Sequence, residues 1–210
     1  MYILWDWNGT LLDDTETCLA ALNDMLAARR LPTIGLDYFK DHFAFPARRF
    51  YEELGIRATG PEWQALAQEF HDRYHSRTPR LNAEARDVLG RLHADKIGQS
   101  VISALRQDLL SRDTAAFGLT DFFDHVYGVD NLDGGTKVAR ALELKALLEK
   151  ERGCEPLVVI GDSLHDKEVA DALGARCVLF GGGSHSLARL AAVAPAFNSL
   201  ADCVACALEG

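Results

Sequence analysis

Two alternating patterns of hydrophobic residues run along this chain, and together they predict an α/β protein. Short apolar runs indicate buried strands, and segments with apolar residues at helical spacing indicate the helices between them. Strands that alternate with helices favour a Rossmann-like, doubly wound parallel sheet that helices cover on both faces. The predicted strands are residues 3–5, 97–102, 125–128, 157–160 and 177–180, and the predicted helices are 83–95, 108–117, 137–152, 167–173 and a last one from about 201.

Residues 15–79 depart from this pattern because they carry no strong strand signal. A helix capped by Asp13 or Asp14 is predicted to run to about Arg30. Prolines then separate several short helical patterns. We therefore expect an all-helical insertion, residues 15–79, in a core domain formed by residues 1–14 and 80–210.

Composition limits the classes of partner. The chain has 210 residues and a formal net charge of −9, so on average it repels polyanions such as DNA and RNA. No apolar run reaches the roughly 20 residues that span a bilayer, so no membrane association is expected. The five cysteines are scattered, which indicates free thiols in a reducing cytosol and a cytoplasmic protein. The oligomeric state stays open.

Polar residues stand where three of the predicted strands end. Asp6 follows the first strand, Ser103 the second and Asp162 the fourth. Ligands of open α/β sheets bind beyond the carboxyl ends of the strands. One acid after one strand means little, because a turn residue there often only caps local amides. Several such groups at one edge of one sheet indicate a functional site.

The acidic residues among them suggest a metal site. Asp162 and Asp166 are four residues apart, and with Asp6 they would form a cluster of three carboxylates. Crowded like charges raise one another's pKa values unless a cation lies among them. Oxygen ligands suit Mg²⁺, which often takes a substrate phosphate oxygen as well. The alternative for Asp166 is a helix cap without a metal.

Ser103 and Lys137 extend this set of candidates. A hydroxyl with backbone amides nearby can hold phosphoryl oxygens. A lysine at the start of a helix can balance the carboxylates and bind phosphate as a point charge. Each residue alone is better explained as ordinary, one as a strand-end serine and the other as a solvated lysine.

Taken together, these residues resemble the motif pattern of the haloacid dehalogenase superfamily. Residues 6–11 (DWNGTL) are similar to its first motif, Ser103 to its second, Lys137 to its third, and Asp162 with Asp166 to its fourth. Order and spacing agree over nearly the whole chain. The helical insertion resembles the small cap of this family, in its phosphoglycolate-phosphatase-like branch.

The resemblance implies a Mg²⁺-dependent phosphatase that acts on a small phosphorylated metabolite through an aspartyl-phosphate. Asp6 is then the residue that attacks phosphorus. The implied catalytic residues are Asp6, Asn8, Ser103 and Lys137. The implied Mg²⁺ ligands are Asp6, Asp162, Asp166 and the backbone carbonyl of Asn8. The implied substrate contacts are Gly9, Thr10, Ser103, Ala104 and Lys137.

Asn8 departs from the family pattern. Family phosphatases usually carry a second aspartate at this position, which protonates the leaving oxygen and then activates water. An amide cannot carry this proton, and general acid–base groups contribute about 10²- to 10⁴-fold. The enzyme is therefore expected to be slow on alkyl phosphates with poor leaving groups. Asp13, Asp14 and His185 are candidates for a substitute acid.

Residues 42–49 of the insertion mix basic and aromatic side chains around Pro46. An arginine can hold a second anionic group of a substrate, and Arg48 is the candidate for this role. The alternative, which we favour from the pattern, is that Arg48 and Arg49 are solvated helix residues.

Two further functions remain open beside the phosphatase. Asn8 alone supports a sensor or regulatory module, which binds a phosphorylated ligand and hardly turns it over. Dehalogenation of a 2-haloacid, with Asp6 attacking carbon, needs neither a metal nor a leaving-group acid. The acidic cluster of Asp162 and Asp166 argues against this third function, because a metal-free site has little use for it.

Overall fold

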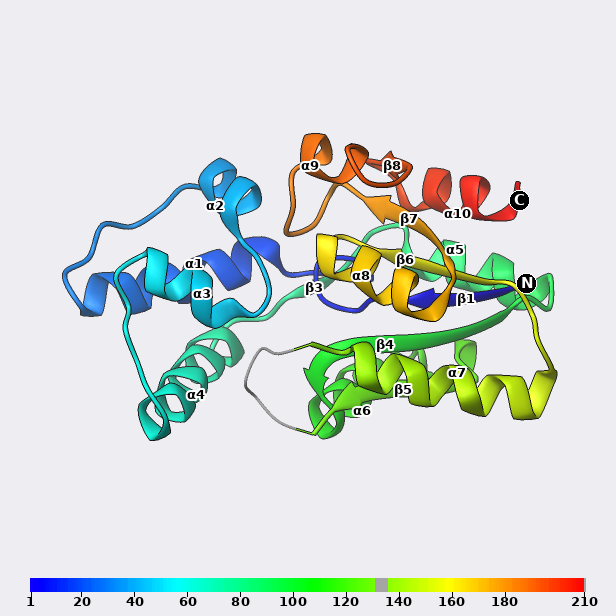
Figure 1. Ribbon diagram of the computed structural model, residues 1–210, viewed down its shortest axis with the longest axis horizontal. Helices are drawn as coiled ribbons and strands as arrows, with labels where there is room; N and C mark the ends of the chain where they lie inside the picture. Colours follow the sequence, from blue (N-terminus) through cyan, green and yellow to red (C-terminus); the bar gives the residue numbers. More distant parts are fainter. Residues whose placement is uncertain (131–135, 210) are drawn as a thin grey trace.

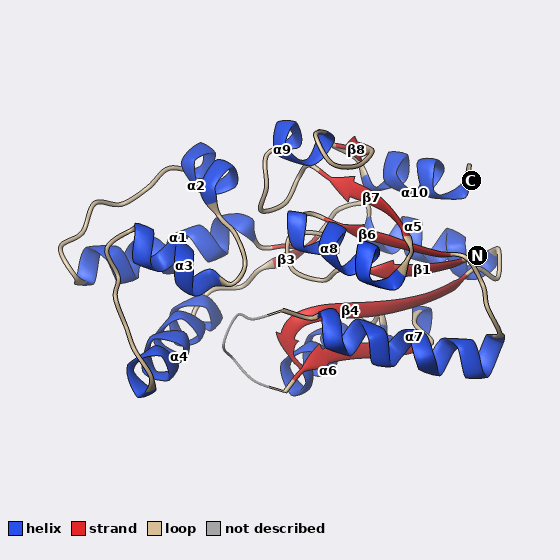
Figure 2. Ribbon diagram, viewed as in Figure 1, coloured by secondary structure: helices blue, strands red, loops and turns tan. Residues whose placement is uncertain are grey.

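The computed structural model describes residues 1–130 and 136–209. Its centre is a six-stranded parallel sheet in the order β5-β4-β1-β6-β7-β8, with helices on both faces (Figures 1 and 2). This arrangement confirms the predicted α/β fold class. The strands of the sheet are β1 (Tyr2–Trp5), β4 (Gly98–Arg106), β5 (His125–Val129), β6 (Leu157–Gly161), β7 (Arg176–Phe180) and β8 (Ala196–Phe197).

The alternation of side chains along β1 explains why both faces of the sheet are covered. Ile3 and Trp5 pack into the apolar cluster that includes α5, α6 and α10, whereas Tyr2 and Leu4 pack with α7 and α8 on the other face. The helices of this core are α5 (Ala85–Ala94), α6 (Gln107–Ala116), α7 (Val138–Arg152), α8 (Leu164–Leu173), α9 (Leu187–Ala191) and α10 (Leu200–Leu208), with a 3₁₀ turn, η1 (Thr120–Phe122).

An all-helical insertion lies beyond the carboxyl ends of the strands (Figure 1). At its base, β2 (Leu12–Asp13) and β3 (Arg80–Leu81) form an antiparallel pair. The helices have their own apolar cluster, which is separate from the two clusters of the sheet. The division at residues 15–79 stays a prediction, and the four helices lie within it: α1 (Thr15–Ala28), α2 (Leu36–His42), α3 (Ala47–Glu53) and α4 (Pro61–His75).

Arg189 of the core holds the insertion at a second place. Its guanidinium donates hydrogen bonds to the carbonyls of Lys40 and Phe43, at distances of 2.8 and 3.0 Å. These carbonyls belong to the C-terminal turn of α2, where a helix carries partial negative charge. The contact therefore fixes α2 beside α9, the short helix that carries Arg189.

Several element boundaries differ from the predicted ones. β4 continues to Arg106 instead of ending at Ile102, and its register against β5 shifts between these two residues. Ser103 therefore lies inside the strand. α8 begins at Leu164, three residues before the predicted start, because Ser163 and Asp166 form a capping box. The short elements β8 and α9 gave no signal that we recognised in the sequence.

No helix in the described part of the chain combines the length and the apolar character that crossing a membrane requires. All five cysteines are free thiols, as predicted.

Truncation of Leu89 tests the packing of α5 against the sheet. Its side chain is fully buried, so Leu89→Ala leaves a cavity and should lower the free energy of unfolding by about 2–5 kcal/mol. Urea denaturation measures this loss. Leu142 on α7 is 46% exposed and provides the matched control, for which the loss should stay within about 0.5 kcal/mol. Equal losses at both positions would contradict the burial described here.

Candidate active site

The loop after β1 carries the first motif to the carboxyl edge of the sheet. Because β1 lies between β4 and β6, Asp6 stands beside the ends of both neighbouring strands. Gly9 has a φ of +75°, a conformation that glycine adopts without steric penalty. A Cβ at this position would lie 2.2 Å from Oδ2 of Asp162. Glycine is therefore required for the Asp162 carboxylate to approach the loop.

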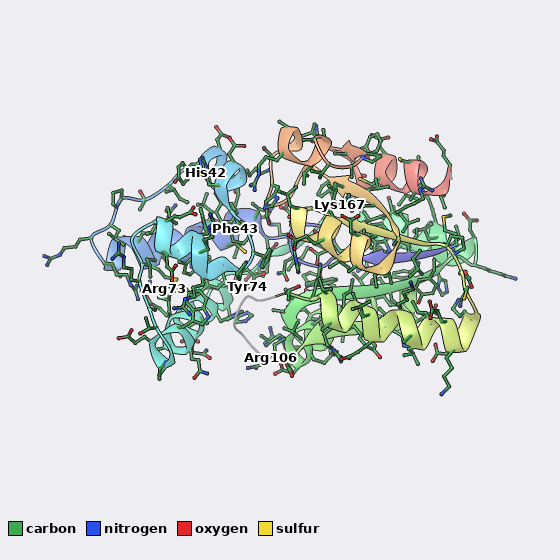
Figure 3. All side chains as sticks on the ribbon, in the orientation of Figure 1. His42, Phe43, Arg73, Tyr74, Arg106 and Lys167 are labelled. Atoms are coloured by element: carbon green, nitrogen blue, oxygen red, sulfur yellow. The ribbon has the colours of Figure 1, made fainter. Side chains whose placement is uncertain are left out.

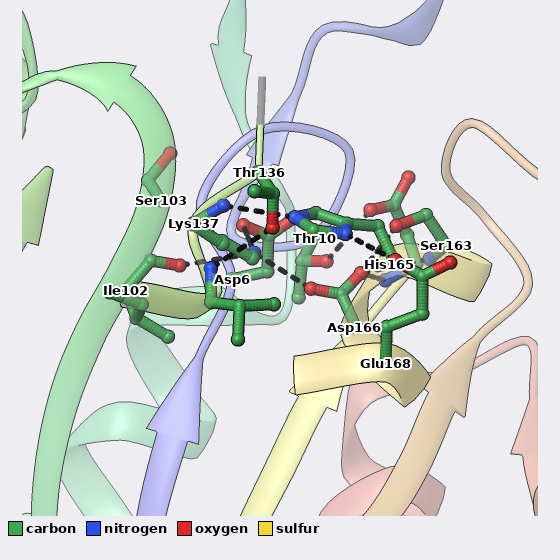
Figure 4. A network of polar contacts seen from close by, with 12 residues as sticks. Asp6, Thr10, Ile102, Ser103, Thr136, Lys137, Ser163, His165, Asp166 and Glu168 are labelled. Atoms are coloured by element: carbon green, nitrogen blue, oxygen red, sulfur yellow. Dashed lines mark hydrogen bonds and ion pairs between the residues drawn. The ribbon is translucent and has the colours of Figure 1, made fainter. Parts of the chain in front are cut away.

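Three buried carboxylates lie close together beside Lys137. Figure 4 shows two of them, Asp6 and Asp166, next to this lysine. Oxygen atoms of Asp6, Asp162 and Asp166 all lie within 4.8 Å of one another. The ammonium of Lys137 forms ion pairs with Asp6 and, at 2.7 Å, with Oδ1 of Asp166. It also donates to the carbonyl of Ile102 at 3.2 Å. The structure thus brings together the candidate residues of the first, third and fourth motifs.

The two oxygens of Asp166 have different partners. Oδ2 accepts hydrogen bonds from the backbone N–H groups of Asp162 and Ser163 and from the Ser163 hydroxyl, at 3.1, 3.0 and 2.7 Å. This oxygen caps the start of α8, whereas Oδ1 faces Lys137. Asp166 can therefore cap the helix and also belong to the acidic cluster, because each role uses a different oxygen of its carboxylate.

Asp162 is held between two loops. The backbone N–H of Ser184 donates to its Oδ2, and the hydroxyl of Thr10 lies 3.5 Å from its Oδ1. A Cβ at Gly183 would lie 2.2 Å from the same Oδ2. The glycine-rich turn after β7 thus leaves room for the Asp162 carboxylate. Gly9, in the loop after β1, does the same on the opposite side of this carboxylate.

Burial and like charge dominate the electrostatics of the cluster. Burial raises the pKa of Asp6, Asp166 raises it further, and Lys137 only partly opposes this rise. Burial also raises the pKa of Asp162 to about 6. For Asp166, burial acts in the same direction, but Lys137 and the Ser163 hydroxyl outweigh it and lower the pKa. One buried lysine thus leaves the cluster with excess negative charge.

Ser103 and Ala104 line the cavity in front of this cluster. The Ser103 side chain is 1% exposed, and its Oγ accepts a hydrogen bond from the N–H of Leu105 at 3.0 Å. In that contact the hydroxyl is the acceptor, so it still carries a proton that it can donate to an anion.

Asn8 is held by a buried carboxylate that we had predicted to cap α1. Asp14, one of the two predicted candidates, is the N-cap residue of α1, but its side chain makes no cap hydrogen bond. Its Oδ2 accepts from Nδ2 of Asn8, and its Oδ1 accepts from the N–H of Gly9, both at 2.7 Å. The hydroxyl of Tyr74, on α4, donates to Oδ2 at 2.7 Å. Burial raises the pKa of Asp14.

A cavity of about 160 Å³ lies between the core and the insertion. Phe43 and Tyr74 lie on the side of the insertion that faces the sheet (Figure 3). Asp6, Asn8, Asp14, Ser103, Lys137 and Asp162 line the cavity from the core, and mostly aromatic and aliphatic side chains line it from the insertion. The cavity therefore has a polar half and an apolar half.

Arg48, Arg49 and His185 do not line this cavity. Arg48 and Arg49 pair with Glu52 and Glu53 along the surface of α3, the arrangement that the sequence pattern favoured. Nδ1 of His185 accepts the N–H of Leu164 at 3.1 Å, and burial lowers the pKa of His185 to about 4. Asp13 is exposed on β2. Of the three candidate substitute acids, only Asp14 reaches the cavity.

Sequence reasoning missed the residues that orient the site. Nε2 of His165 accepts the backbone N–H of Lys137 at 3.1 Å, and Nδ1 of His165 contacts Glu168 at 2.9 Å. Tyr74 reaches Asp14 from the insertion, 60 positions away in the chain. The histidine beside Asp166 offered a weak signal, whereas the tyrosine lies in an ordinary amphipathic helix and offered none.

Comparison with known proteins identifies the family. The sequence profile described as "Haloacid dehalogenase-like hydrolase" matches residues 3–180, which is most of the chain. The chain belongs to the haloacid dehalogenase-like hydrolases. Membership confirms the predicted resemblance and the prediction of an enzyme of the hydrolase class.

Curated haloacid dehalogenase-like relatives include two proteins named phosphoglycolate phosphatase. The one from Caulobacter vibrioides is 30% identical over 83% of this chain and 74% of its own length. The one from Chromobacterium violaceum is 27% identical over 86% of this chain and 85% of its own length. These relatives support the predicted branch and a phosphatase-like hydrolase.

The fold is also found in solved structures of the family. A haloacid dehalogenase-like family hydrolase from Streptococcus pneumoniae superposes with a TM-score of 0.74 at 17% identity, over 97% of this chain and 96% of the other.

Titration of the acidic cluster should be visible in the stability of the metal-free protein. The pKa of Asp162 in the folded protein is about 6, above its ordinary value of 3.8, so the folded state binds more protons than the unfolded state between these values. The free energy of unfolding in EDTA should therefore rise as the pH falls through 6. We expect Asp162→Asn to reduce this rise by about 1–3 kcal/mol, because each pKa unit corresponds to about 1.4 kcal/mol.

Urea unfolding at pH 7.5 and at pH 5 in EDTA measures the difference. Asp13→Asn provides the control, because it removes an exposed carboxylate outside the acidic cluster. Identical pH dependence in the wild type and Asp162→Asn would show that Asp162 does not titrate in this range.

Proposed function

We propose that this protein is a Mg²⁺-dependent phosphatase that hydrolyses a small phosphorylated metabolite through an aspartyl-phosphate on Asp6. The observation that carries the proposal is the cluster of Asp6, Asp162, Asp166 and Lys137. All of these except Asp166 line one wall of the cavity. In a metal-independent dehalogenase this excess of buried negative charge would have no use. The proposed location is cytoplasmic.

The residues present fit a divalent cation. Three carboxylates with oxygens close together, balanced by one lysine, form a hard-oxygen donor set of the kind that Mg²⁺ prefers. The proposed ligands are Asp6, Asp162, Asp166 and the backbone carbonyl of Asn8. When bound, the ion offsets the charge on the phosphoryl group, so that an anionic substrate can approach the carboxylates.

The proposed reaction uses the polar half of the cavity. One oxygen of Asp6 attacks phosphorus, and the phosphoryl group is transferred to this carboxylate. Lys137 pairs with Asp6 and holds the group as a fixed positive charge, and Ser103 donates its hydroxyl proton to a phosphoryl oxygen. Ala104 borders the group beside Ser103, whereas Gly9 and Thr10 do not line the cavity and instead lie against Asp162. Arg48 is left out of this proposal because it does not line the cavity.

Asn8 changes what this site can do with a leaving group. Its Nδ2 is bound to Asp14, so the amide presents Oδ1 as an acceptor and has no titratable proton to give. This observation also favours a second candidate function, in which the protein binds a phosphorylated ligand and turns it over very slowly.

Removal of the nucleophile tests the proposed mechanism. Asp6→Ala should lower the hydrolysis of 4-nitrophenyl phosphate by about 10³-fold or more, because the covalent route is lost. Wild-type activity should disappear in EDTA and return on addition of Mg²⁺. Asp13→Ala is the matched control and should keep wild-type rates, because Asp13 is exposed and lies outside the cavity. Undiminished activity in Asp6→Ala would rule out the assigned nucleophile.

The substitution Asn8→Asp distinguishes the two candidate functions, a phosphatase that lacks a general acid and a protein that only binds its ligand. The new carboxyl would face Asp14, whose Oδ2 lies 2.7 Å from Nδ2 of Asn8, and two carboxyls at this distance share a proton. We expect hydrolysis of an alkyl phosphate to rise by about 10²- to 10⁴-fold. The rise for 4-nitrophenyl phosphate should be much smaller, because that leaving group needs no proton.

Steady-state rates on the two esters measure this difference, with Asn8→Ser as the control that adds no acid. If neither ester is hydrolysed by the wild type or by Asn8→Asp, while phosphate still binds, the second candidate function is the correct one.

A further inference from the structure

The half of the cavity that belongs to the insertion offers no charge to a substrate. Among its described lining residues there is no lysine, arginine, aspartate or glutamate. The one histidine there, His71, is neutral at pH 7, because burial lowers its pKa to about 4. The aromatic residues of this half are Phe39, Phe43, Phe45, Tyr51, Phe70 and Tyr74.

The core offers no spare cation either. Of the described residues that line the cavity, only Lys137 and Arg106 are lysine or arginine. Lys137 is engaged by Asp6 and Asp166, and Arg106 is engaged by both oxygens of Asp108, at 2.6 and 2.8 Å. A second anionic group on the substrate, such as the carboxylate of phosphoglycolate, would lie against aromatic rings without a partner. Burial of an unpaired charge is strongly unfavourable.

The shape of the cavity suits one aromatic ring. Phe43 is stacked on Phe39 with centroids 4.9 Å apart and meets Phe45 edge to face at 5.2 Å. Phe45 also lies 5.3 Å from the ring of His165 and so spans from the insertion to the core. The volume of about 160 Å³ includes the polar half, so the apolar half has room for no more than one ring; an apolar cavity of about 150 Å³ holds one benzene.

Asn8 points to the same substrates by an independent route. Asp14, the one candidate acid that reaches the cavity, accepts hydrogen bonds on both of its oxygens from Asn8, Gly9 and Tyr74 and donates none to the described residues. The site must therefore expel the leaving group as an anion. A phenol has a pKa of about 10, as tyrosine does, whereas an aliphatic alcohol is nearly as weak an acid as water, about 16. An aryl oxide therefore leaves without the proton that an amide cannot supply.

We propose that the substrates of this site are phosphate monoesters of phenols with a single ring. This proposal rests on the phosphatase function proposed above. The ring occupies the apolar half and the phosphoryl group faces Asp6. The bond from an Asp6 oxygen to phosphorus forms as the bond from phosphorus to the aryl oxygen breaks, and the phenolate takes a proton from water. A second water then cleaves the aspartyl-phosphate, which releases inorganic phosphate and restores Asp6.

Three esters separate ring binding from leaving-group chemistry in the Mg²⁺-loaded wild type. Phenyl phosphate should be hydrolysed with a kcat/KM about 100-fold or more above that of 2-phosphoglycolate, because only the latter buries an unpaired charge. Benzyl phosphate carries the ring on an alkyl oxygen. Its KM should stay within about 3-fold of the value for phenyl phosphate, while its kcat falls by about 100-fold or more.

Substitution of Phe45 tests the lining itself. Phe45 is only half-buried, so both variants should fold, which circular dichroism and thermal melting check. Phe45→Arg places a cation at the cavity and should lower the KM for 2-phosphoglycolate by about 10-fold or more. Phe45→Met removes the ring without adding charge and should give no such gain.

Two failures can be told apart. Wild-type preference for 2-phosphoglycolate over phenyl phosphate, abolished in Asp6→Ala, would overturn the substrate class and leave the phosphatase intact. Absence of Asp6-dependent hydrolysis of all three esters would overturn the proposed function, and the substrate class with it.

Discussion

The burial of three carboxylates around one lysine is the constraint on which the rest of this site depends. Removal of Asp6, Asp162 and Asp166 from water disfavours their charged forms, and Lys137 compensates only part of that effect. The surrounding backbone is arranged for close approach. Glycines at 9 and 183 leave the space next to Asp162, and the first turn of α8 holds Asp166. The proposed Mg²⁺ site rests on the oxygens of these three carboxylates.

The insertion completes the site from the opposite side. Tyr74 reaches from α4 to Asp14, and Asp14 holds both the side chain of Asn8 and the backbone of Gly9. Arg189 ties α2 to the core at another point. These contacts place an apolar wall over a charged one. In the proposed reaction, phosphoryl transfer uses the fixed charges of the core. Discrimination between leaving groups depends on the apolar residues of the insertion that line the cavity.

Family membership and the particulars of the cavity answer different questions. Membership in the haloacid dehalogenase-like hydrolases gives the class of reaction, hydrolysis. Within a shared fold, the residues that touch the rest of the substrate determine which ester reacts. In this chain those residues are aromatic and uncharged, and the position that usually holds an acid is an amide tied to a neighbouring carboxylate.

The sequence by itself determined the alternation of the longer core strands, β1, β4, β5, β6 and β7, with helices, and it marked the residues of the acidic cluster. Apolar runs that end at Asp6 and Asp162 mark the carboxyl ends of two strands. In a parallel sheet these ends lie at the same edge, so the residues that follow them come close together. Local patterns could not show that the Asp14 side chain turns away from α1 or that β4 continues past Ser103. Only the tertiary structure decided these points, because each depends on partners far away in the chain, such as Tyr74 for Asp14 and β5 for β4.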